Sequence, residues 1–256
     1  MIKQSAEDWP SSMNPYKSNP PENSVGIVIP MKDNLKFFKL AFHSVLSFTD
    51  YPYMMTIVNN MSSFSTEKRL RSLAYNHQIN ILNYQQDFNY SAEINLGLRY
   101  MFANPSVKYG LILNSDVVVE PYWLSNMVKN LNKVPEAGII GPMSNMAISE
   151  QMGLIRMKQL KELGYVSGFC MMIKRETFEA LDGFDESYIG GCYEDRDFCY
   201  RASQKGWKTM LDCSTYIHHF WKVTRGQDSR TESQTLANRN RFFQKFPELV
   251  KDKAVA

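Results

Sequence analysis

The sequence predicts an α/β fold with a mostly parallel central sheet flanked by helices. Short apolar runs rich in β-branched residues alternate along the chain with longer segments whose apolar residues recur at helical spacing. The first run, at residues 25–30, is almost continuously apolar, which is typical of a strand covered on both faces in a parallel sheet. Such sheets bind ligands outside the carboxyl ends of their strands.

Composition limits the class of protein. With 256 residues, 44% of them hydrophobic, the chain can bury a full core as one large domain with appendages. Its 29 basic and 26 acidic residues leave a net charge of +3 without a cluster, so no nucleic-acid partner is expected. The four cysteines show no CxxC pairing and are interpreted as reduced thiols.

No apolar stretch approaches the roughly 18 residues of a membrane span, and the N-terminus lacks an apolar signal core. The sequence therefore predicts no transmembrane segment and a cytoplasmic protein. Peripheral membrane association through a basic C-terminal tail is the alternative left open.

In the first half, a Pro-rich arm at residues 1–24 precedes the first strand, and strands and helices then alternate. Ser91 is a good N-cap for the helix that precedes the fourth strand. After residues 25–30, the elements are expected as a helix opening at 33–34, a strand at 54–58, a helix at 66–75, a strand at 79–82, the helix after Ser91 and a strand ending at 114–116.

In the second half, Pro121 opens a helix, and residues 142–164 are Met-rich and irregular, either a mobile lid or a segment without an assignment. Gly206 is expected to end the helix that starts at Glu194. The other elements are expected as strands at 138–141, 165–173, 207–211 and 215–218, a short helix at 175–181 and a basic helical tail at 231–246.

Polar residues stand where the predicted strands end. Asn59 and Asn60 follow the second strand, and Asn114 and Asp116 follow the fourth. Because parallel strands end at one edge of a sheet, these side chains should line one rim. For Asp116, an ordinary turn acid before the next helix is the alternative.

Glu194 and Asp195 form an acidic pair in the first turn of a short helix, where the helix dipole favours ionised carboxylates and suits a general base. Gly190 and Gly191 lie just before them and let another molecule approach the backbone. A charged helix start beside a turn is the alternative.

Five motifs, in order, resemble those of the family-2 glycosyltransferases. They are Val25-Gly26-Ile27-Val28-Ile29-Pro30, Ile57-Val58-Asn59-Asn60-Met61-Ser62-Ser63, the stretch from Asn89 to Gly97, Leu113-Asn114-Ser115-Asp116, and Val166-Ser167-Gly168-Phe169 with Asp182-Gly183-Phe184-Asp185-Glu186 and Glu194-Asp195-Arg196-Asp197. The resemblance implies a GT-A nucleotide-diphospho-sugar transferase fold with a Rossmann-like sheet. Residues 25–222 would form the catalytic domain, 25–120 its nucleotide-binding half, 121–222 its acceptor-binding half, and 223–256 a helical tail.

The resemblance also implies an inverting transfer from a UDP-, GDP- or dTDP-linked sugar to a glycan or other hydroxyl acceptor. Asp195 would be the base, with Glu194 sharing the role or holding the acceptor. A divalent cation, Mn²⁺ or Mg²⁺, would be held by Asp116 with His218 or His219, and His218 is the preferred choice. Nucleotide-sugar contacts are expected at Pro30, Asn59, Asn60, Asn89, Asn95, Asn114, Ser115 and Asp116, and acceptor contacts at Gly168, Gly191 and Trp221.

The chain departs from the family pattern where Asn59, Asn60 and Asn114 replace acids, which predicts weaker metal binding and leaves the nucleotide open. Helix capping and loop hydrogen bonds are an alternative role for Asn89 and Asn95. Two other functions remain: a sugar-nucleotide nucleotidyltransferase, although residues 30–33 lack the glycine of a phosphate loop, and a non-catalytic carbohydrate-binding or partner module.

Overall fold

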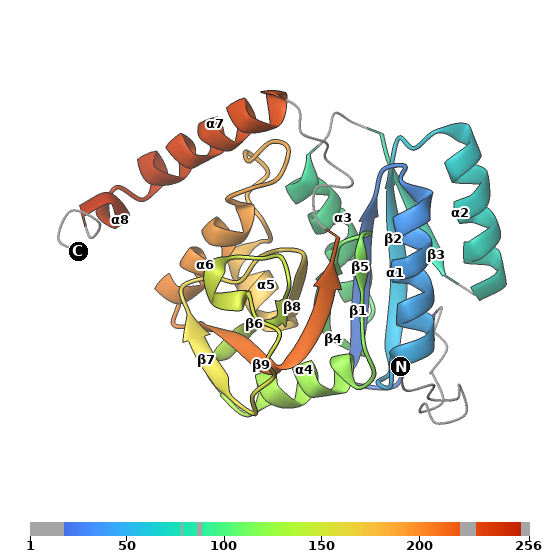
Figure 1. Ribbon diagram of the computed structural model, residues 1–256, viewed down its shortest axis with the longest axis horizontal. Coiled ribbons are helices and arrows are strands. Elements are labelled where there is room, and N and C mark those ends of the chain that lie inside the picture. The colour runs from blue at the N-terminus through green and yellow to red at the C-terminus, as the bar shows by residue number, and fades with distance from the viewer. Residues whose placement is uncertain (1–17, 78, 86–88, 221–228, 252–256) are drawn as a thin grey trace.

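The computed structural model describes residues 18–77, 79–85, 89–220 and 229–251, and the described strands form one nine-stranded sheet in the order β3-β2-β1-β4-β8-β6-β9-β5, with β7 also paired to β9 (Figure 1). The strands are β1 (Ser24–Met31), β2 (Tyr53–Asn60), β3 (Asn80–Tyr84), β4 (Val107–Leu113), β5 (Val117–Val118), β6 (Ala137–Ser144), β7 (Leu160–Leu163), β8 (Cys170–Lys174) and β9 (Lys208–His219). The helices are α1 (Leu35–Phe48), α2 (Phe64–His77), α3 (Tyr90–Phe102), α4 (Trp123–Asn132), the 3₁₀ turn η2 (Ser149–Gln151), α5 (Arg175–Leu181), α6 (Glu194–Gln204), α7 (Ser229–Lys245) and α8 (Glu248–Lys251).

The predicted α/β fold is confirmed. Strands β3, β2, β1 and β4 pair in parallel, as the alternating pattern of the first half of the sequence requires. Beyond β4 the sheet becomes mixed, because β8 enters antiparallel between β4 and β6, while β6 and β9 run parallel. The carboxyl ends of β1, β2 and β4 therefore share one edge, which is the rim that the sequence predicts.

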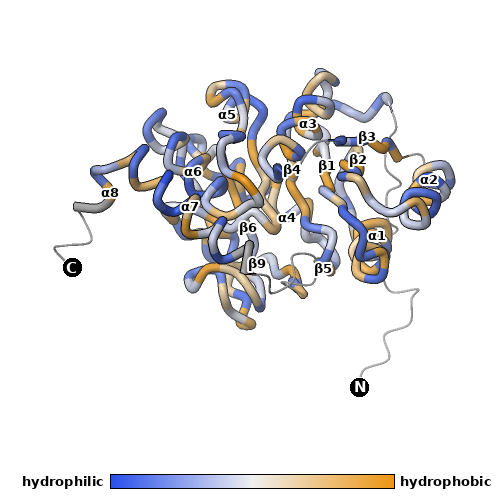
Figure 2. Tube along the Cα trace, turned by 90° about the horizontal axis from the view of Figure 1, so that it is seen from above, coloured by the Kyte–Doolittle hydropathy of each residue, from blue (hydrophilic) through white to orange (hydrophobic). Residues whose placement is uncertain are grey.

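Helix α3 lies unusually close to the parallel strands. A Cβ added to Gly97 would stand 2.3 Å from Cγ1 of Val28 and 3.1 Å from Cγ2 of Val58, so only glycine permits this approach. Figure 2 shows apolar residues gathered along β1, β2 and β4, where the buried cores on the two faces of the sheet meet. This contact fixes the position of α3 and of the polar side chains that it carries toward the rim.

Strand β9 corrects one prediction, because a single strand replaces the two expected at 207–211 and 215–218. The pairing with β6 shifts from Pro142 opposite Asp212 to Met143 opposite Tyr216, which leaves 213–215 as a bulge. The Asp212 carboxylate holds the bulge by accepting from the Ser214 amide at 2.9 Å. The polar residues that indicated a break in the strand are thus the ones that stabilise its bulge.

The boundaries of two other predicted segments also differ. Residues 142–164 are not wholly irregular, since β6 runs on to Ser144 and both η2 and β7 follow. The strand expected at 165–173 begins only at Cys170, because residues 165–169 turn toward α6 and the rim. None of the described helices combines the length and apolarity that crossing a membrane requires.

Candidate active site

The end of β9 and the residues after β4 meet at the rim. The two-residue strand β5 pairs antiparallel with β9, placing Val117 opposite His219, so Asp116 lies beside the His219 ring. Asp116 Oδ1 is 3.3 Å from His219 Nε2, and both side chains are buried. The pairing of the short strand β5 with β9 thus brings a carboxylate and an imidazole together.

Three contacts fix the position of His219, two through its ring and one through its backbone. Its Nδ1 lies 3.1 Å from the carbonyl oxygen of Met146, its backbone N–H donates to Asn145 Oδ1 at 2.8 Å, and its face stacks on Phe169 with centroids 4.9 Å apart. A carbonyl oxygen can only accept, so Nδ1 carries a proton, and in the neutral ring Nε2 would present its lone pair to Asp116. Two electron-pair donors facing each other are stabilised by a cation.

The residues around Asp116 limit what can hold a metal ion. Asn114 Oδ1 accepts from the Tyr90 hydroxyl at 2.7 Å, and its Nδ2 lies 3.4 Å from His219 Nε2. No group of three or more His, Cys, Asp or Glu side chains converges in the described part of the chain. Asp116 and His219 fit a divalent cation as two protein ligands, and the remaining ligands would come from water or from a bound diphosphate.

His218 lies on the opposite side of β9. Its side chain is half-buried, its ring meets the edge of Phe220 with centroids 4.7 Å apart, and it pairs across the strand with Val118. Only His219 contacts Asp116 among the two histidines. The geometry therefore favours His219 over His218 as the second metal-site residue.

Asn59 and Asn60 end β2 at the same rim, and both are buried. Asn59 Nδ2 donates to Asn83 Oδ1 at 3.1 Å, and Asn60 Nδ2 donates to Glu93 on α3. Both amide oxygens lack a hydrogen-bond partner among the described residues. A buried acceptor without a hydrogen bond lowers the stability of the folded protein, and a nucleotide base or ribose could donate the missing hydrogen bonds.

Two other predicted nucleotide contacts lie beside this edge. Pro30 is buried in β1 opposite Val58, and Ser115 is buried between Asn114 and Asp116. Asp33, which the sequence pattern did not single out as a site residue, joins the loops after β1 and β2. Its carboxylate accepts from the Ser63 amide at 2.9 Å, and this hydrogen bond lowers the pKa of Asp33. Its position directly after the first strand is the signal that could have identified it.

Asn89 and Asn95 use their hydrogen bonds within the protein. Asn89 caps α3 by accepting from the Ala92 amide at 3.1 Å and donates to the Glu186 carbonyl at 2.7 Å. Asn95 exchanges hydrogen bonds of 2.8 Å with the backbone of Phe184. These contacts agree with the alternative role of the two asparagines in helix capping and loop hydrogen bonds. Together they hold the 183–186 loop against α3.

Glu194 and Asp195, the two acids predicted to face the acceptor, begin α6. Gly168 N–H donates to Asp195 Oδ2 at 3.1 Å, and a Cβ added to Gly168 would stand 4.0 Å from Glu194 Oε1. Glu194 is buried and Asp195 is half-buried. The structure therefore brings together Gly168, Glu194 and Asp195, as the sequence predicts. Trp221, another predicted acceptor contact, lies outside the described residues.

The loop before α6 has an uncommon backbone. Four consecutive residues, from Gly190 to Tyr193, have positive φ angles of 77°, 70°, 88° and 71°. Asn238 of α7, which is buried, donates to the carbonyl oxygens of Ile189 at 2.9 Å and Cys192 at 3.1 Å. A left-handed backbone costs about 1 kcal/mol or more at each non-glycine residue, so these donors help to hold the strained loop.

A second contact from α7 neutralises buried charge below this loop. Lys245 Nζ donates to Asp185 Oδ2 and to Asp197 Oδ2, both at 2.6 Å, and Asp197 also pairs with Arg201. Burial raises the pKa of Asp185, but hydrogen bonds from Lys245 and Ser187 outweigh it and bring the pKa down to about 2. The basic C-terminal helix is therefore part of the site's framework.

Lys245→Met is expected to lower the free energy of unfolding by about 1–3 kcal/mol at neutral pH, because Asp197 stays buried with one cation fewer. The pKa of Asp185 lies below its usual 3.8, so this stabilisation is present above about pH 4 and is lost as the pH falls toward about 2. Urea unfolding of the unmodified protein and of Lys245→Met should show that the difference in their free energies of unfolding decreases across that pH range. Lys208→Met, which removes an exposed ion pair with Glu162, should change the free energy of unfolding much less, because solvent screens that pair. An equal loss in the two variants would contradict the assignment.

The chain is similar to known families over most of its length. A family model described as glycosyl transferase family 2 matches residues 26–182, more than half of the chain. The uncharacterized protein y4gI of Sinorhizobium fredii is 24% identical in an alignment 259 positions long, which covers 90% of this chain and 27% of that protein. The O-antigen biosynthesis protein RfbC of Myxococcus xanthus is 25% identical in an alignment 238 positions long, which covers 82% of this chain and 18% of that protein. The chain thus spans less than a third of either relative.

Solved structures are similar in fold at low sequence identity. The structure of GalNAc-T7 with UDP, GalNAc and Mn²⁺ has a TM-score of 0.71 at 15% identity, covering 87% of this chain and 48% of that one. The mannosyltransferase PcManGT of Pyrobaculum calidifontis, in complex with GDP-Man and Mn²⁺, has a TM-score of 0.67 at 15% identity, covering 90% and 67%. Both neighbours have the GT-A fold.

Proposed function

Since the chain belongs to glycosyltransferase family 2 and has the GT-A fold, we propose that it transfers a sugar from a nucleoside-diphosphate donor to an acceptor hydroxyl with inversion. One observation carries this proposal. Gly168 donates to Asp195, while the adjacent Phe169 stacks on His219 and accepts from the Asn114 amide at 2.8 Å. Two neighbouring residues thus touch both the acceptor-side base and the donor-side pair.

On the donor side, Asp116 and His219 would hold Mn²⁺ or Mg²⁺, which when bound neutralises charge on the departing diphosphate. A mixed carboxylate and imidazole pair suits Mn²⁺ better than Mg²⁺, which prefers oxygen ligands. Asn59 and Asn60 would accept hydrogen bonds from the nucleoside through their buried amide oxygens. The neighbours carry UDP and GDP-Man, so a UDP- or GDP-linked donor is tested first.

On the acceptor side, Asp195 would take the proton of the attacking hydroxyl. Its carboxylate stands at the N-terminus of α6 and accepts from the Gly168 amide, and both interactions favour the ionised form that a base requires. As the hydroxyl oxygen bonds to the anomeric carbon, the sugar–phosphate bond breaks on the opposite face, which inverts the configuration. Glu194 would help to hold the acceptor.

A donor screen tests the proposal. The purified protein is given UDP-, GDP- and dTDP-sugars, with and without Mn²⁺, and nucleotide release is recorded. We expect one nucleotide class to be released in a metal-dependent reaction that glycan acceptors accelerate. Saturable glycan binding without release from any donor would contradict transfer and favour the non-catalytic module, to which Asn59, Asn60 and Asn114 give some support because they replace acids.

A further inference from the structure

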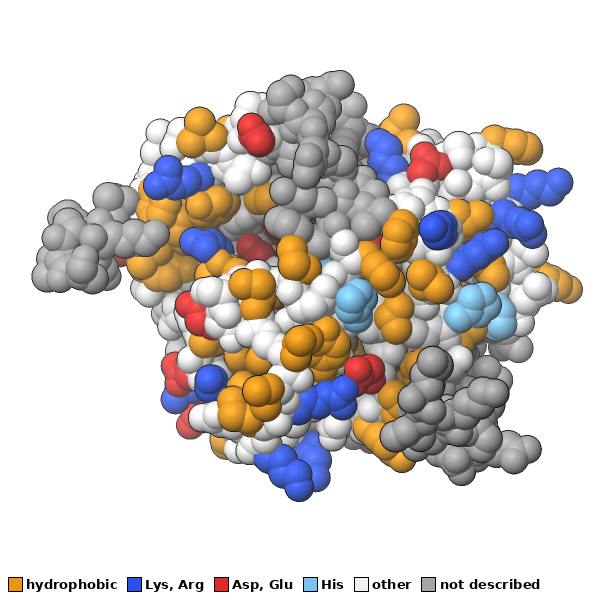
Figure 3. Space-filling view, in the orientation of Figure 1, with side chains coloured by type: hydrophobic (Ala, Val, Ile, Leu, Met, Phe, Trp, Pro, Cys, Tyr) orange, Lys and Arg blue, Asp and Glu red, His pale blue; other side chains and the backbone are white. Residues whose placement is uncertain are grey.

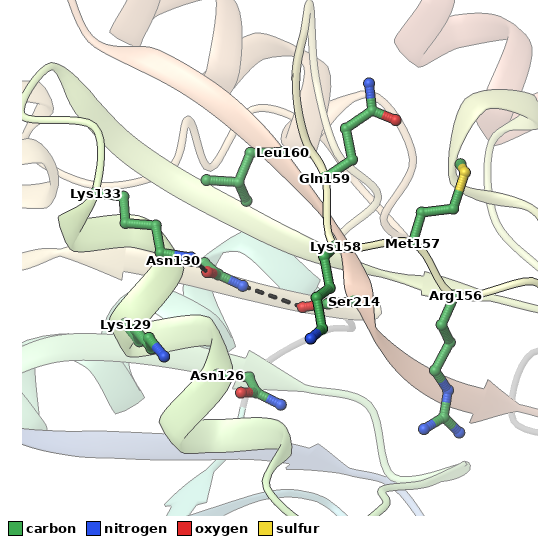
Figure 4. Close-up of a pocket in the computed structure, with 10 residues that line it drawn as sticks. All are labelled: Asn126, Lys129, Asn130, Lys133, Arg156, Met157, Lys158, Gln159, Leu160 and Ser214. Carbon is green, nitrogen blue, oxygen red and sulfur yellow. Dashed lines mark hydrogen bonds between the residues drawn. The ribbon is translucent and has the colours of Figure 1, made fainter.

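A basic pocket lies apart from the candidate active site. Helix α4 and the segment 156–160 border a solvent-open hollow of about 500 Å³ whose charged side chains are exposed, and none of the lining residues belongs to the rim or to the Glu194–Asp195 pair (Figure 4). In Figure 1, α4 lies at the lower edge of the molecule, away from the arrowheads of β1 and β2. The charged lining residues are Lys129, Lys133, Arg156 and Lys158.

The walls of the pocket are held by hydrogen bonds. The Met157 amide donates to the Cys213 carbonyl at 3.0 Å, and the Cys213 amide donates to Gln159 at 3.1 Å, which fixes the segment to β9. From the other wall, Asn130 donates to the Ser214 hydroxyl at 3.2 Å, a bond visible in Figure 4. These hydrogen bonds hold both walls in place, so binding requires little ordering of the backbone.

The charge in the pocket is not balanced. No lining residue is acidic, and Arg156 alone among the four cations forms an ion pair in the described part of the chain, with Glu120, which does not line the pocket. Lys133 Nζ donates to Asn130 Oδ1 at 2.6 Å, which leaves its charge in place. Figure 4 shows Lys158 extending toward α4, from which Lys129 projects. Like charges from two facing walls repel, and an anion between them removes that cost.

We propose that this pocket binds a phosphate group of an anionic ligand. Lysine ammonium groups are suited to phosphate as compact point charges, and the amides of Asn126 and Gln159 add neutral donors. The net charge of the whole chain is only +3, so the attraction for anions comes from the lysines and the arginine of this pocket and not from the chain as a whole. Figure 3, in the orientation of Figure 1, shows Lys and Arg side chains at the lower edge of the molecule. The site is independent of the transfer reaction proposed above.

The test is a titration with inorganic phosphate, followed by NMR, in EDTA so that no metal-bound phosphate at the rim contributes. The pocket variant Lys129→Gln/Lys158→Gln is compared with Lys68→Gln/Lys205→Gln, which removes the same charge from two exposed lysines elsewhere. We expect saturable binding that is at least about tenfold weaker in the pocket variant only. Absence of saturable binding, or equal weakening in both double variants, would overturn the proposal.

A second arm identifies the source of the phosphate group. Leu154 and Ile155 precede the pocket in sequence and are 77% and 78% exposed. If the phosphate belongs to a lipid headgroup, sedimentation with phosphatidylcholine vesicles should require added phosphatidylglycerol and should weaken in both the pocket variant and Leu154→Ser/Ile155→Ser. Phosphate binding without vesicle binding assigns a free phosphate compound. Binding to neither probe rejects the site.

Discussion

Replacing Asp195 with asparagine is expected to lower sugar transfer by about 10²–10⁴-fold while the protein stays folded. The amide oxygen can still accept the hydrogen bond that Gly168 donates at 3.1 Å, so the local structure is retained. The amide cannot take a proton from the acceptor hydroxyl, and the loss should therefore appear in kcat for transfer. The measurement compares transfer rates at saturating donor and acceptor, with urea unfolding as the check on folding.

Asp182→Asn is the matched control for this experiment. Asp182 is an exposed acid whose ion pair with Arg99 lies outside the acceptor-side centre, and asparagine tolerates its left-handed backbone. Its transfer rate should equal that of the unmodified protein. Full transfer activity in a folded Asp195→Asn protein would remove Asp195 as the base, and a comparable loss in Glu194→Gln instead would move that role to Glu194.

Asp116→Asn is expected to reduce metal-dependent nucleotide release by about 10²-fold or more, because Asp116 is the only carboxylate beside His219 among the described residues. Mn²⁺ binding, followed by electron paramagnetic resonance without any donor, should weaken as well. His219→Ala should weaken Mn²⁺ binding in the same assay, since Nε2 presents its lone pair to the same position. The binding readout does not depend on turnover.

His218→Ala is the control that the chain itself provides. His218 is adjacent in sequence but lies on the other side of β9 against Phe220. Its removal should leave Mn²⁺ affinity unchanged. The reverse result, with His218→Ala impaired and His219→Ala normal, would show that the metal site differs from the arrangement described above.

The rim could be predicted from the sequence because it follows from strand order alone. Asn59 and Asn60 end the buried strand β2, Asp116 follows shortly after β4, and parallel strands end at one edge. The choice between His218 and His219 could not be made in this way. The bulge at 213–215 interrupts the alternation of side chains along β9, so counting from the buried start of the strand does not reveal which histidine faces inward.

The contacts of α7 were not predicted, because they join residues far apart in sequence. A basic helix with mostly exposed residues was expected to be a tail, yet Asn238 and Lys245 reach the loop and the acids around α6. The signal was Phe242, four residues after Asn238. An aromatic side chain and an amide one turn apart on the same face indicate that this face is covered.

The left-handed run from Gly190 to Tyr193 also has a consequence for the order in which the protein matures. Asn238, which donates to the carbonyl oxygens of this loop, is synthesised well after the loop itself. The N-terminal part of the chain leaves the ribosome first, so β1, β2 and β4 are available for pairing while the loop still lacks its partner. The loop is therefore expected to reach its final conformation only after α7 has been synthesised.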